Sequence, residues 1–324
     1  MNVRAEQIMI SIIIPVFRGA ESIGPLVDSL IESLRPHFSF EIILVNDCSP
    51  DDSERVCIEL HEKYKSIIKF YSLAKNVGEH NAVMAGLNNA TGEWAVIMDD
   101  DFQNPVSEVI NLATFAVANT YDAVYTYYDK KKHSLLRNIG SRFNDKVASI
   151  MLKKPKDLYL SSFKAVNRFL IDEIIKYELP FPYIDGLILR TTSNIGRLHV
   201  RHGERLRGKS GYTFRKLVSL WLTSFTNFSV IPLRISTTVG FAFAVLGFIV
   251  GIEMVIEKIM EPSLPVGYAL LVFLITVFAG TQLIAIGMVG EYIGRMFLCQ
   301  NKKPQYSIRK AYERSPKDAD NGKK

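Results

Sequence analysis

Two long stretches near the end of the chain carry no charged residue. They cover residues 235–252 and 262–290. A helix needs roughly 17–25 apolar residues to cross a hydrocarbon core about 30 Å thick. Both stretches reach this length, so the sequence predicts two membrane-spanning helices joined by a short turn. A buried hairpin of a soluble protein is the alternative, and two such runs in succession make it the weaker one.

Positive charges lie outside this pair of stretches and are scarce between them. The turn carries one lysine, Lys258, whereas both outer flanks are rich in Arg and Lys. The flanking cations are Arg201, Arg205, Arg207, Lys209, Arg215, Lys216 and Arg234 on one side, and Arg295, Lys302, Lys303, Arg309 and Lys310 on the other. The positive-inside rule puts both flanks in the cytoplasm and the turn outside. We therefore expect a multi-pass protein of the inner or plasma membrane whose termini and first ~230 residues are cytoplasmic.

This interpretation divides the chain into four parts. They are an α/β domain (1–212), an amphipathic juxtamembrane helix (213–234), a two-helix transmembrane hairpin (235–298) and a cytoplasmic tail (299–324). In the second part, apolar residues such as Phe214, Leu217 and Trp221 recur at helical spacing beside cations. An apolar face with cations at its rim is typical of a helix that lies at the lipid headgroups.

Strand and helix patterns alternate through the first part. Apolar runs rich in β-branched residues predict strands, and amphipathic stretches between them predict helices. The strands are at 10–16, 40–45, 67–73, 94–98 and 195–200, and the helices are at 21–34, 53–65 and 81–89. This succession predicts an α/β fold with a mostly parallel sheet and helices on both faces. The net charge of +6 is spread along the chain, so we expect no nucleic-acid partner.

Polar residues recur where four of the predicted strands end. They are Arg18, Asp47, Lys75 with Asn76, and Asp99 to Asp101. The carboxyl ends of parallel strands converge on one crevice in an α/β sheet, and ligands bind there. The sequence therefore predicts a ligand site that several strands build together.

The three consecutive acids at 99–101 are the most specific part of this site. Asp99 and Asp101 are two positions apart, so they point the same way on an extended chain. Clustered carboxylates repel one another unless a cation lies between them. A hard divalent cation prefers oxygen ligands and can bridge to a substrate phosphate, and oxygen ligands suit both Mg²⁺ and Mn²⁺. A solvated acidic turn is the alternative, but the apolar strand before the acids favours the metal site.

Two nucleotide-binding patterns can be compared with the chain. The dinucleotide fingerprint GxGxxG is absent, which argues against a Rossmann oxidoreductase. Residues 203–210 match the P-loop pattern GxxxxGK followed by Ser, and a strand precedes them. Gly211 is a poor residue for the helix that must follow, so a P-loop nucleotide hydrolase is a weak alternative. The cations of this segment can hold phosphate without forming that fold.

The order of several motifs resembles a known family. The motifs are PVF at 15–17, VNDCS at 45–49, NVG at 76–78 and DDDFQNP at 99–105, followed by GKSGY at 208–212, PLR at 232–234 and GEYIGR at 290–295. Together they resemble family 2 glycosyltransferases of the GT-A fold, in the branch of polyprenyl-phosphate glycosyltransferases similar to dolichyl-phosphate mannose synthase. The GEHNA segment at 78–82 and the tail are most similar to bacterial undecaprenyl-phosphate sugar transferases, such as the formamido-arabinose type.

The resemblance implies roles for individual residues. Pro15, Phe17, Glu21 and Asp47 would line the pocket for the nucleotide, to which we add Lys75, Asn76 and Asp100. Asp99, Asp101 and Gln103 would hold the metal, and Asp100 would face the sugar or nucleotide. Arg137, Arg205, Arg207, Lys209 and Ser210 would hold the acceptor phosphate. The predicted catalytic residues are Asp99, Asp100, Asp101, Arg137 and Arg205.

The implied reaction is inverting, metal-dependent transfer of a sugar from a nucleotide sugar, with UDP favoured, to undecaprenyl phosphate. A processive polysaccharide synthase is one alternative, but its usual QxxRW motif is absent because Trp94 and Trp221 lie in other settings. A non-catalytic membrane scaffold is another, and it leaves the polar strand ends unexplained. Small residues of the second span, including Gly280, Ala285 and Gly287, permit close helix packing, so we expect a homo-oligomer.

The chain also departs from the family pattern. Phe17-Arg18 replaces the usual Tyr-Asn, and Asn46-Asp47-Cys48-Ser49 replaces Asp-Asp-Gly-Ser. Some relatives carry an Asp near 163–164, where this chain has Ser161 and Ser162. These differences bear on the identity of the sugar and on whether a protein base assists the reaction.

Overall fold

The computed structural model describes residues 8–128, 154–155, 158–201, 203, 231–260, 268–301 and 303–313. The chain divides into two compact units. Residues 1–211 and 302–324 form one unit, which contains the sheet, and residues 212–301 form the other, which contains two long helices. We call them the sheet unit and the helix unit.

Eight strands form one sheet in the described part of the sheet unit. They are β1 (Met9–Val16), β2 (Ser39–Asn46), β3 (Ile68–Leu73), β4 (Trp94–Ile97), β5 (Ala123–Tyr127), β6 (Lys164–Asn167), β7 (Ile195–His199) and β8 (Ile308–Tyr312). Their order across the sheet is β7-β5-β6-β4-β1-β2-β3-β8. The neighbours β4, β1, β2 and β3 run parallel, whereas β6 and β8 pair antiparallel with the strands beside them. The predicted α/β fold with a mostly parallel sheet is confirmed.

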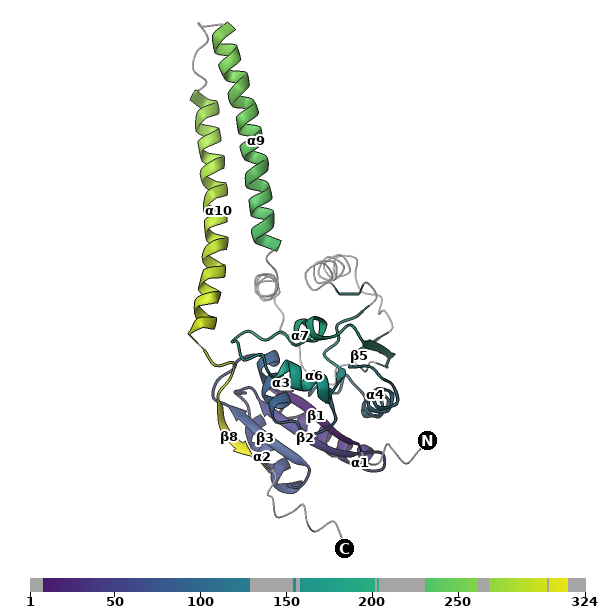
Figure 1. Ribbon diagram of the computed structural model, residues 1–324. Helices are drawn as coiled ribbons and strands as arrows, with labels where there is room; N and C mark the ends of the chain where they lie inside the picture. Colours follow the sequence, from purple (N-terminus) through teal and green to yellow (C-terminus); the bar gives the residue numbers. More distant parts are fainter. Residues whose placement is uncertain are drawn as a thin grey trace. The chain divides into compact units, whose positions relative to one another are not determined.

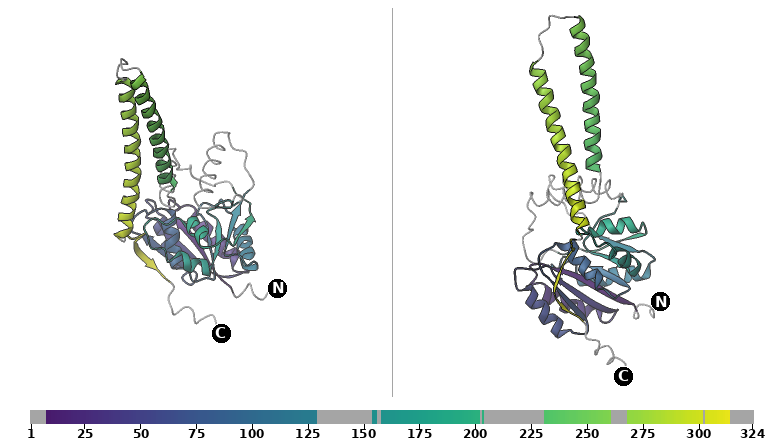
Figure 2. Two further views of the ribbon diagram at one scale, coloured as in Figure 1. Left: turned by 45° about the horizontal axis from the view of Figure 1, so that its top comes forward. Right: turned by 60° about the vertical axis from the view of Figure 1, so that its left-hand side comes forward.

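Helices cover both faces of this sheet (Figure 1 and Figure 2). On one face pack α1 (Ile23–Leu34), α2 (Ser53–Lys63) and α4 (Val106–Ala118), and on the other pack α3 (Glu79–Asn88), α6 (Arg168–Ile174) and α7 (Ile184–Thr191). Because both faces are covered, the central strands are apolar along their whole length. In β1, for example, Ile12 and Ile14 belong to the first core layer and Ile13 to the second.

The close approach of α3 to the sheet requires a glycine. A Cβ at Gly86 would lie 2.4 Å from Cγ2 of Ile13, which is far inside van der Waals contact. The absence of a side chain at Gly86 therefore lets α3 pack directly on β1. This contact matters for the site, because the first turn of α3 lies beside the carboxyl ends of the central strands.

The helix unit consists of α9 (Ile231–Met260) and α10 (Tyr268–Gln300). Their segments Ser236–Glu253 and Val277–Gln300 are long and apolar enough to cross a membrane, by length and composition. The rings of Phe243 and Phe278 meet edge to face between the two helices, with centroids 6.3 Å apart. These helices confirm the two predicted candidate spans. Of the predicted juxtamembrane helix, the part before Ile231 lies outside the described residues.

The strand β8 belongs to the sheet unit although it follows α10 in the chain. It pairs antiparallel with β3, so that Ser72 lies opposite Lys310 and Phe70 opposite Tyr312. The sequence analysis predicts only a tail for residues 299–324, and the structure shows an edge strand within it. Most of this strand is exposed, so it lacks the apolar run by which the buried strands are found.

Candidate functional site

The loops after β1, β2 and β4 contain backbone that ordinary residues avoid. Arg18, Cys48 and Phe102 have positive φ angles of 59°, 49° and 61°, and among the described residues they are the only ones apart from glycine that do. A left-handed conformation is unfavourable for a residue with a Cβ, and it persists where surrounding contacts impose it. Three such residues at adjacent strand ends mark this edge of the sheet as a candidate functional site.

Asp47 joins the end of β2 to the loop that follows β3. Its carboxylate accepts the backbone N–H of Val77 at 2.8 Å and that of Gly78 at 2.9 Å. The residue is only 4% exposed, and this burial raises the pKa of Asp47, while the two N–H groups act in the opposite direction. Lys75 and Asn76 directly precede Val77, so Asp47 fixes the loop that carries both of them.

Asp100 connects the ends of β1 and β4. Its carboxylate accepts the backbone N–H of Phe17, and a Cβ at Gly19 would lie 2.2 Å from its Oδ2. Burial and the charge of Asp99 raise the pKa of Asp100 to about 7. Its Oδ2 atom is buried and has no hydrogen-bond partner among the residues that the structure describes. A buried acceptor of this kind is stabilised when a ligand supplies a donor or a positive charge.

Separate contacts orient the two outer acids. The Ser162 hydroxyl donates to Oδ2 of Asp99 at 2.7 Å, and Oδ1 of Asp101 accepts the backbone N–H of Gln103 at 3.1 Å. The Gln103 carbonyl accepts the backbone N–H of Gly203 at 2.8 Å. Gly203 is the first glycine of the P-loop-like pattern, so the start of that segment lies against the acidic loop.

A group of buried polar side chains lies between β5, β6 and α7. Lys164 forms an ion pair with Asp185, and the Tyr125 hydroxyl donates to the same carboxylate at 2.7 Å. Lys164 and Asp185 are both nearly fully buried. Breaking one partner of such a pair leaves an uncompensated charge, which is strongly destabilising. The pair therefore holds β6 and α7 together.

Glu79 and His80 are the first two residues of α3, and the charges of Lys164 and Asp185 affect the pKa values of both. Burial and the charge of Asp99 raise the pKa of Glu79 to about 7, and burial lowers the pKa of His80 to about 4, which keeps its imidazole neutral near pH 7. The ring of His80 meets that of Tyr183 edge to face, with centroids 5.1 Å apart. The sequence analysis assigns no role to these residues, and their only signal was the GEHNA segment.

The predicted metal ligands are Asp99, Asp101 and Gln103. Within the described ranges, no group of three or more His, Cys, Asp or Glu side chains is arranged to hold a metal ion. The predicted set contains two carboxylates and one amide, so it is not a group of that kind. Its chemistry nevertheless fits a divalent cation. Burial and the neighbouring charges of Asp99 and Asp101 raise the pKa of Asp100, and its buried Oδ2 has no hydrogen-bond partner among the described residues. A cation with a preference for oxygen ligands would relieve that repulsion.

The structure brings one set of predicted residues together, and a second set lies outside the described residues. At or just beyond the carboxyl ends of β1, β2, β3 and β4 lie Pro15, Phe17, Glu21, Asp47, Lys75, Asn76, Asp99, Asp100, Asp101 and Gln103. The predicted acceptor-side residues Arg137, Arg205, Arg207, Lys209 and Ser210 lie outside the described residues. The individual roles of both sets stay predictions.

The family model of glycosyl transferase family 2 matches residues 11–175. The chain belongs to glycosyl transferase family 2. The matched range runs from β1 to α6 and includes the strand ends with Asp47 and Asp99 to Asp101. The protein is therefore a glycosyltransferase, and the resemblance inferred from the motifs is confirmed.

Relatives extend this similarity to nearly the whole chain. The undecaprenyl-phosphate 4-deoxy-4-formamido-L-arabinose transferase of Enterobacter sp. (strain 638) is 31% identical over 310 residues, which cover 94% of each chain. The enzyme of the same name from Proteus mirabilis (strain HI4320) is 29% identical over 304 residues, which cover 93% of each chain. Among solved structures, glucosyl-3-phosphoglycerate synthase from Mycobacterium tuberculosis, in complex with Mn²⁺ and UDP-glucose, is 17% identical with a TM-score of 0.48 and covers 66% of this chain and 75% of that one.

Proposed function

We propose that this glycosyltransferase moves a sugar from a UDP-sugar to undecaprenyl phosphate. The observation that carries the proposal is the extent of the similarity to undecaprenyl-phosphate transferases, which reaches 94% of this chain and so includes the candidate membrane helices. A lipid phosphate lies at the membrane surface, and two spans hold an enzyme beside it. A glycosyltransferase domain attached to two membrane spans therefore suits a lipid acceptor better than a soluble one.

The donor nucleotide, on this proposal, lies across the ends of β1, β2 and β3. Asp47 supports it indirectly by holding the loop of Lys75 and Asn76, and Phe17 is 44% exposed and available to pack against a base. Pro15, Glu21 and Asp100 complete the proposed nucleotide set. UDP is favoured because the motifs resemble those of the bacterial branch.

The diphosphate lies at the acidic loop. Asp99, Asp101 and Gln103 are the proposed ligands of Mg²⁺ or Mn²⁺, and such a cation, when bound, neutralises charge on the leaving diphosphate. The protein contributes the orientation of these ligands. The Ser162 hydroxyl holds Asp99, and the backbone N–H of Gln103 holds Asp101. Asp100 lies between them with an unpaired buried oxygen, among the described residues, that can face the sugar.

The acceptor supplies its own nucleophile. A phosphate monoester has a second pKa near 6, so an undecaprenyl phosphate is largely dianionic near neutral pH. One of its oxygens attacks the anomeric carbon as the bond to the diphosphate breaks, and the configuration inverts. No protein base has to remove a proton in this step. Two anions must approach each other, and for this we propose Arg137, Arg205, Arg207, Lys209 and Ser210 as the acceptor-phosphate set.

The proposed location follows from the charges that flank the spans. The sheet unit and both termini then lie on the cytoplasmic side of the membrane. Small residues in α10 agree with a homo-oligomer, which stays a prediction.

The test is transfer of radiolabelled sugar from a panel of UDP- and GDP-sugars to undecaprenyl phosphate in detergent, with Mg²⁺ or Mn²⁺ and with a chelator. We expect one glycolipid, formed from a UDP-sugar and abolished by the chelator, and the productive donor identifies the sugar. Product from a GDP-sugar alone would overturn the choice of nucleotide. Failure of every donor with folded protein that also binds no UDP would overturn the proposal.

A further inference from the structure

The C-terminal segment that follows α10 returns to the edge of the sheet beside the proposed nucleotide pocket. There β8 pairs with β3, whose carboxyl end leads into Lys75 and Asn76. The segment is anchored independently of any ligand. The Tyr312 ring stacks on Phe70 with centroids 5.7 Å apart, and the Gln305 amide donates to the backbone carbonyl of Leu179 at 2.9 Å.

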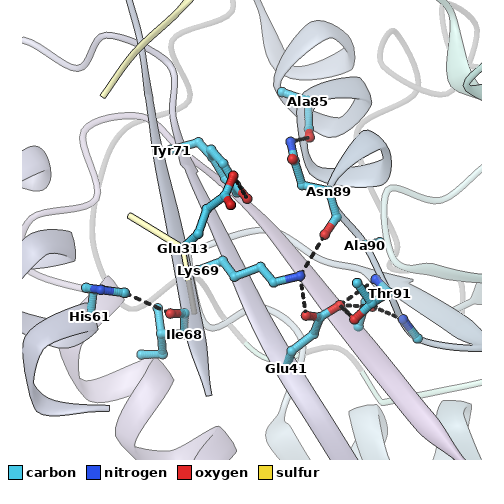
Figure 3. Close-up of polar contacts among 12 residues, drawn as sticks. Glu41, His61, Ile68, Lys69, Tyr71, Ala85, Asn89, Ala90, Thr91 and Glu313 are labelled. Atoms are coloured by element: carbon cyan, nitrogen blue, oxygen red, sulfur yellow. Dashed lines mark hydrogen bonds and ion pairs between the residues drawn. The ribbon is translucent and has the colours of Figure 1, made fainter. Parts of the chain in front are cut away.

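The far end of the segment makes further contacts with β3. Figure 3 shows Glu313 directed toward Tyr71, whose hydroxyl donates to it at 3.4 Å. Nearby, Lys69 pairs with the buried carboxylate of Glu41 at 2.7 Å, at the amino ends of the strands. Both contacts lie at the opposite end of β3 from the proposed nucleotide pocket. Only the contact of Tyr71 with Glu313 involves the C-terminal segment, and it helps to hold the end of that segment against β3.

The first residues of the segment hold the backbone just before the nucleotide loop. The N–H of Ala74 donates to the carbonyl of Ser307 at 2.8 Å. The carbonyl of Ala74 accepts from the guanidinium of Arg309 at 3.1 Å. Both backbone polar groups of Ala74 thus form hydrogen bonds with the C-terminal segment. Lys75 is the next residue, so the starting position of the loop is set by β8.

A second set of contacts connects β8 to β2 through the side chains of Lys310, Glu54, Ser72 and Asn46. Lys310 forms an ion pair with Oε1 of Glu54 at 2.6 Å, and the Ser72 hydroxyl donates to Oε2 at 2.7 Å. These two partners lower the pKa of Glu54, the contact with Lys310 first. The amide of Asn46 donates to the Ser72 hydroxyl at 3.2 Å. Asn46 directly precedes Asp47, so this set of contacts ends at the carboxylate that holds the other end of the loop.

We propose that Arg309 and Lys310 are positioning residues for the donor nucleotide, through the docking of β8 against the loop after β3 and against Glu54. The inference rests on the proposed function, which places the nucleotide at Asp47, Lys75 and Asn76. A pocket that is correctly formed for only a fraction of the time binds its ligand more weakly by that fraction. By linkage, nucleotide binding and β8 docking stabilise each other.

The variant to test is Arg309→Met with Lys310→Met in the full chain, because both side chains are largely exposed and their loss leaves the core intact. We expect the Kd for UDP with Mn²⁺ and the KM for the donor to rise about fivefold to tenfold, since an exposed ion pair and one charged hydrogen bond are weakened. We expect kcat and the KM for undecaprenyl phosphate to change less than about twofold, because β4 and its acids are untouched. The conservative variant Arg309→Lys with Lys310→Arg keeps both charges and should bind UDP with most of the wild-type affinity.

A matched control removes two lysines of other exposed ion pairs. Lys63→Met with Lys176→Met breaks the contacts with Asp28 and Glu173, away from the nucleotide loop, and should leave the Kd for UDP unchanged. An unchanged Kd in the Arg309 and Lys310 variant overturns the inference, as does an equal rise in the control. Wild-type protein that binds no UDP overturns the proposed function as well.

A second measurement needs no variant. Saturating UDP with Mn²⁺ should slow hydrogen exchange of the backbone amides of β8 in wild-type protein more than those of β7, which lies at the opposite edge of the sheet. Equal protection of both strands, with UDP shown to be bound, would overturn the inference without touching the proposed function.

Discussion

Replacement of Asp47 by Ala separates the role of this carboxylate in stability from its role in binding. The carboxylate is buried and accepts two backbone N–H groups, at 2.8 and 2.9 Å. Hydrogen bonds to a charged acceptor contribute about 1.5–3 kcal/mol each, so the pair contributes roughly 3–6 kcal/mol before the desolvation of the carboxylate is counted. Burial raises the pKa of Asp47 and offsets part of this gain. We expect Asp47→Ala to lower the free energy of unfolding by about 2–4 kcal/mol.

The assay is thermal unfolding in detergent together with UDP binding. A loss of this size lowers the Tm of a domain of this length by roughly 4–16 °C. The Kd for UDP with Mn²⁺ should rise at least about tenfold, because the loop of Lys75 and Asn76 loses its anchor. Asp47→Asn keeps one acceptor oxygen and should fall between wild type and Asp47→Ala in both measurements.

Asp28→Ala is the matched control for this prediction. Asp28 accepts from Lys63 and Tyr64 at the surface, so its loss should change the free energy of unfolding by less than about 1 kcal/mol and leave UDP binding intact. A wild-type Kd for UDP in a destabilised Asp47→Ala protein would refute the view that this carboxylate positions the nucleotide loop. An unchanged Tm would refute the energetic reasoning itself.

Three further predictions concern the acidic loop and the core. Because the folded pKa of Asp100 is raised from 3.8 to about 7, its contribution to stability is lost as the pH rises through that range, so the Tm of metal-free Asp100→Asn should rise relative to wild type between about pH 4 and pH 7 and stay higher above it. Ser162→Ala should weaken Mn²⁺ binding roughly tenfold to a hundredfold, because it removes the hydroxyl that orients Asp99. Gly86→Ala should lower the free energy of unfolding by about 1–3 kcal/mol, because its Cβ collides with β1.

Each of these has a result that contradicts it. A Tm difference between Asp100→Asn and wild type that does not grow with pH would show that this carboxyl is ionised throughout. Equal Mn²⁺ affinity in Ser162→Ala and in the exposed control Ser193→Ala would remove Ser162 from the site. A Gly86→Ala protein as stable as wild type in denaturant unfolding would show that α3 can move away from β1 at no cost.

The sequence predicts the strands that are buried and the polar residues at their ends. Apolar runs rich in β-branched residues locate β1 to β4 to within about two residues, because strands covered on both faces need such runs. The convergence of Asp47 and Asp99 to Asp101 follows from the parallel order of those strands. The periodicity of apolar residues is sufficient to predict the strands. The order of strands and helices is sufficient to predict that their ends meet, because βαβ units place strands in parallel.

Other parts of the site depend on contacts that local pattern does not encode. Ser162 reaches Asp99 only because β6 inserts antiparallel beside β4, a pairing between strands distant in sequence. The charged strand β8 has no apolar run, and its place beside β3 is set by Tyr312 and by the ion pair of Lys310 with Glu54, which are far apart in sequence. The raised pKa of Glu79 likewise arises from the charge of Asp99, which only the folded structure brings near.

The most direct test of the central claim is the rate at which wild-type protein and Asp101→Ala form sugar-linked undecaprenyl phosphate from a UDP-sugar in liposomes. Our account predicts rapid, chelator-sensitive transfer by wild type, transfer at a similar rate by the Asp28→Ala control, and near-complete loss in Asp101→Ala with its Tm retained. Undiminished transfer by Asp101→Ala would contradict the assignment of catalysis to the acidic loop at the end of β4.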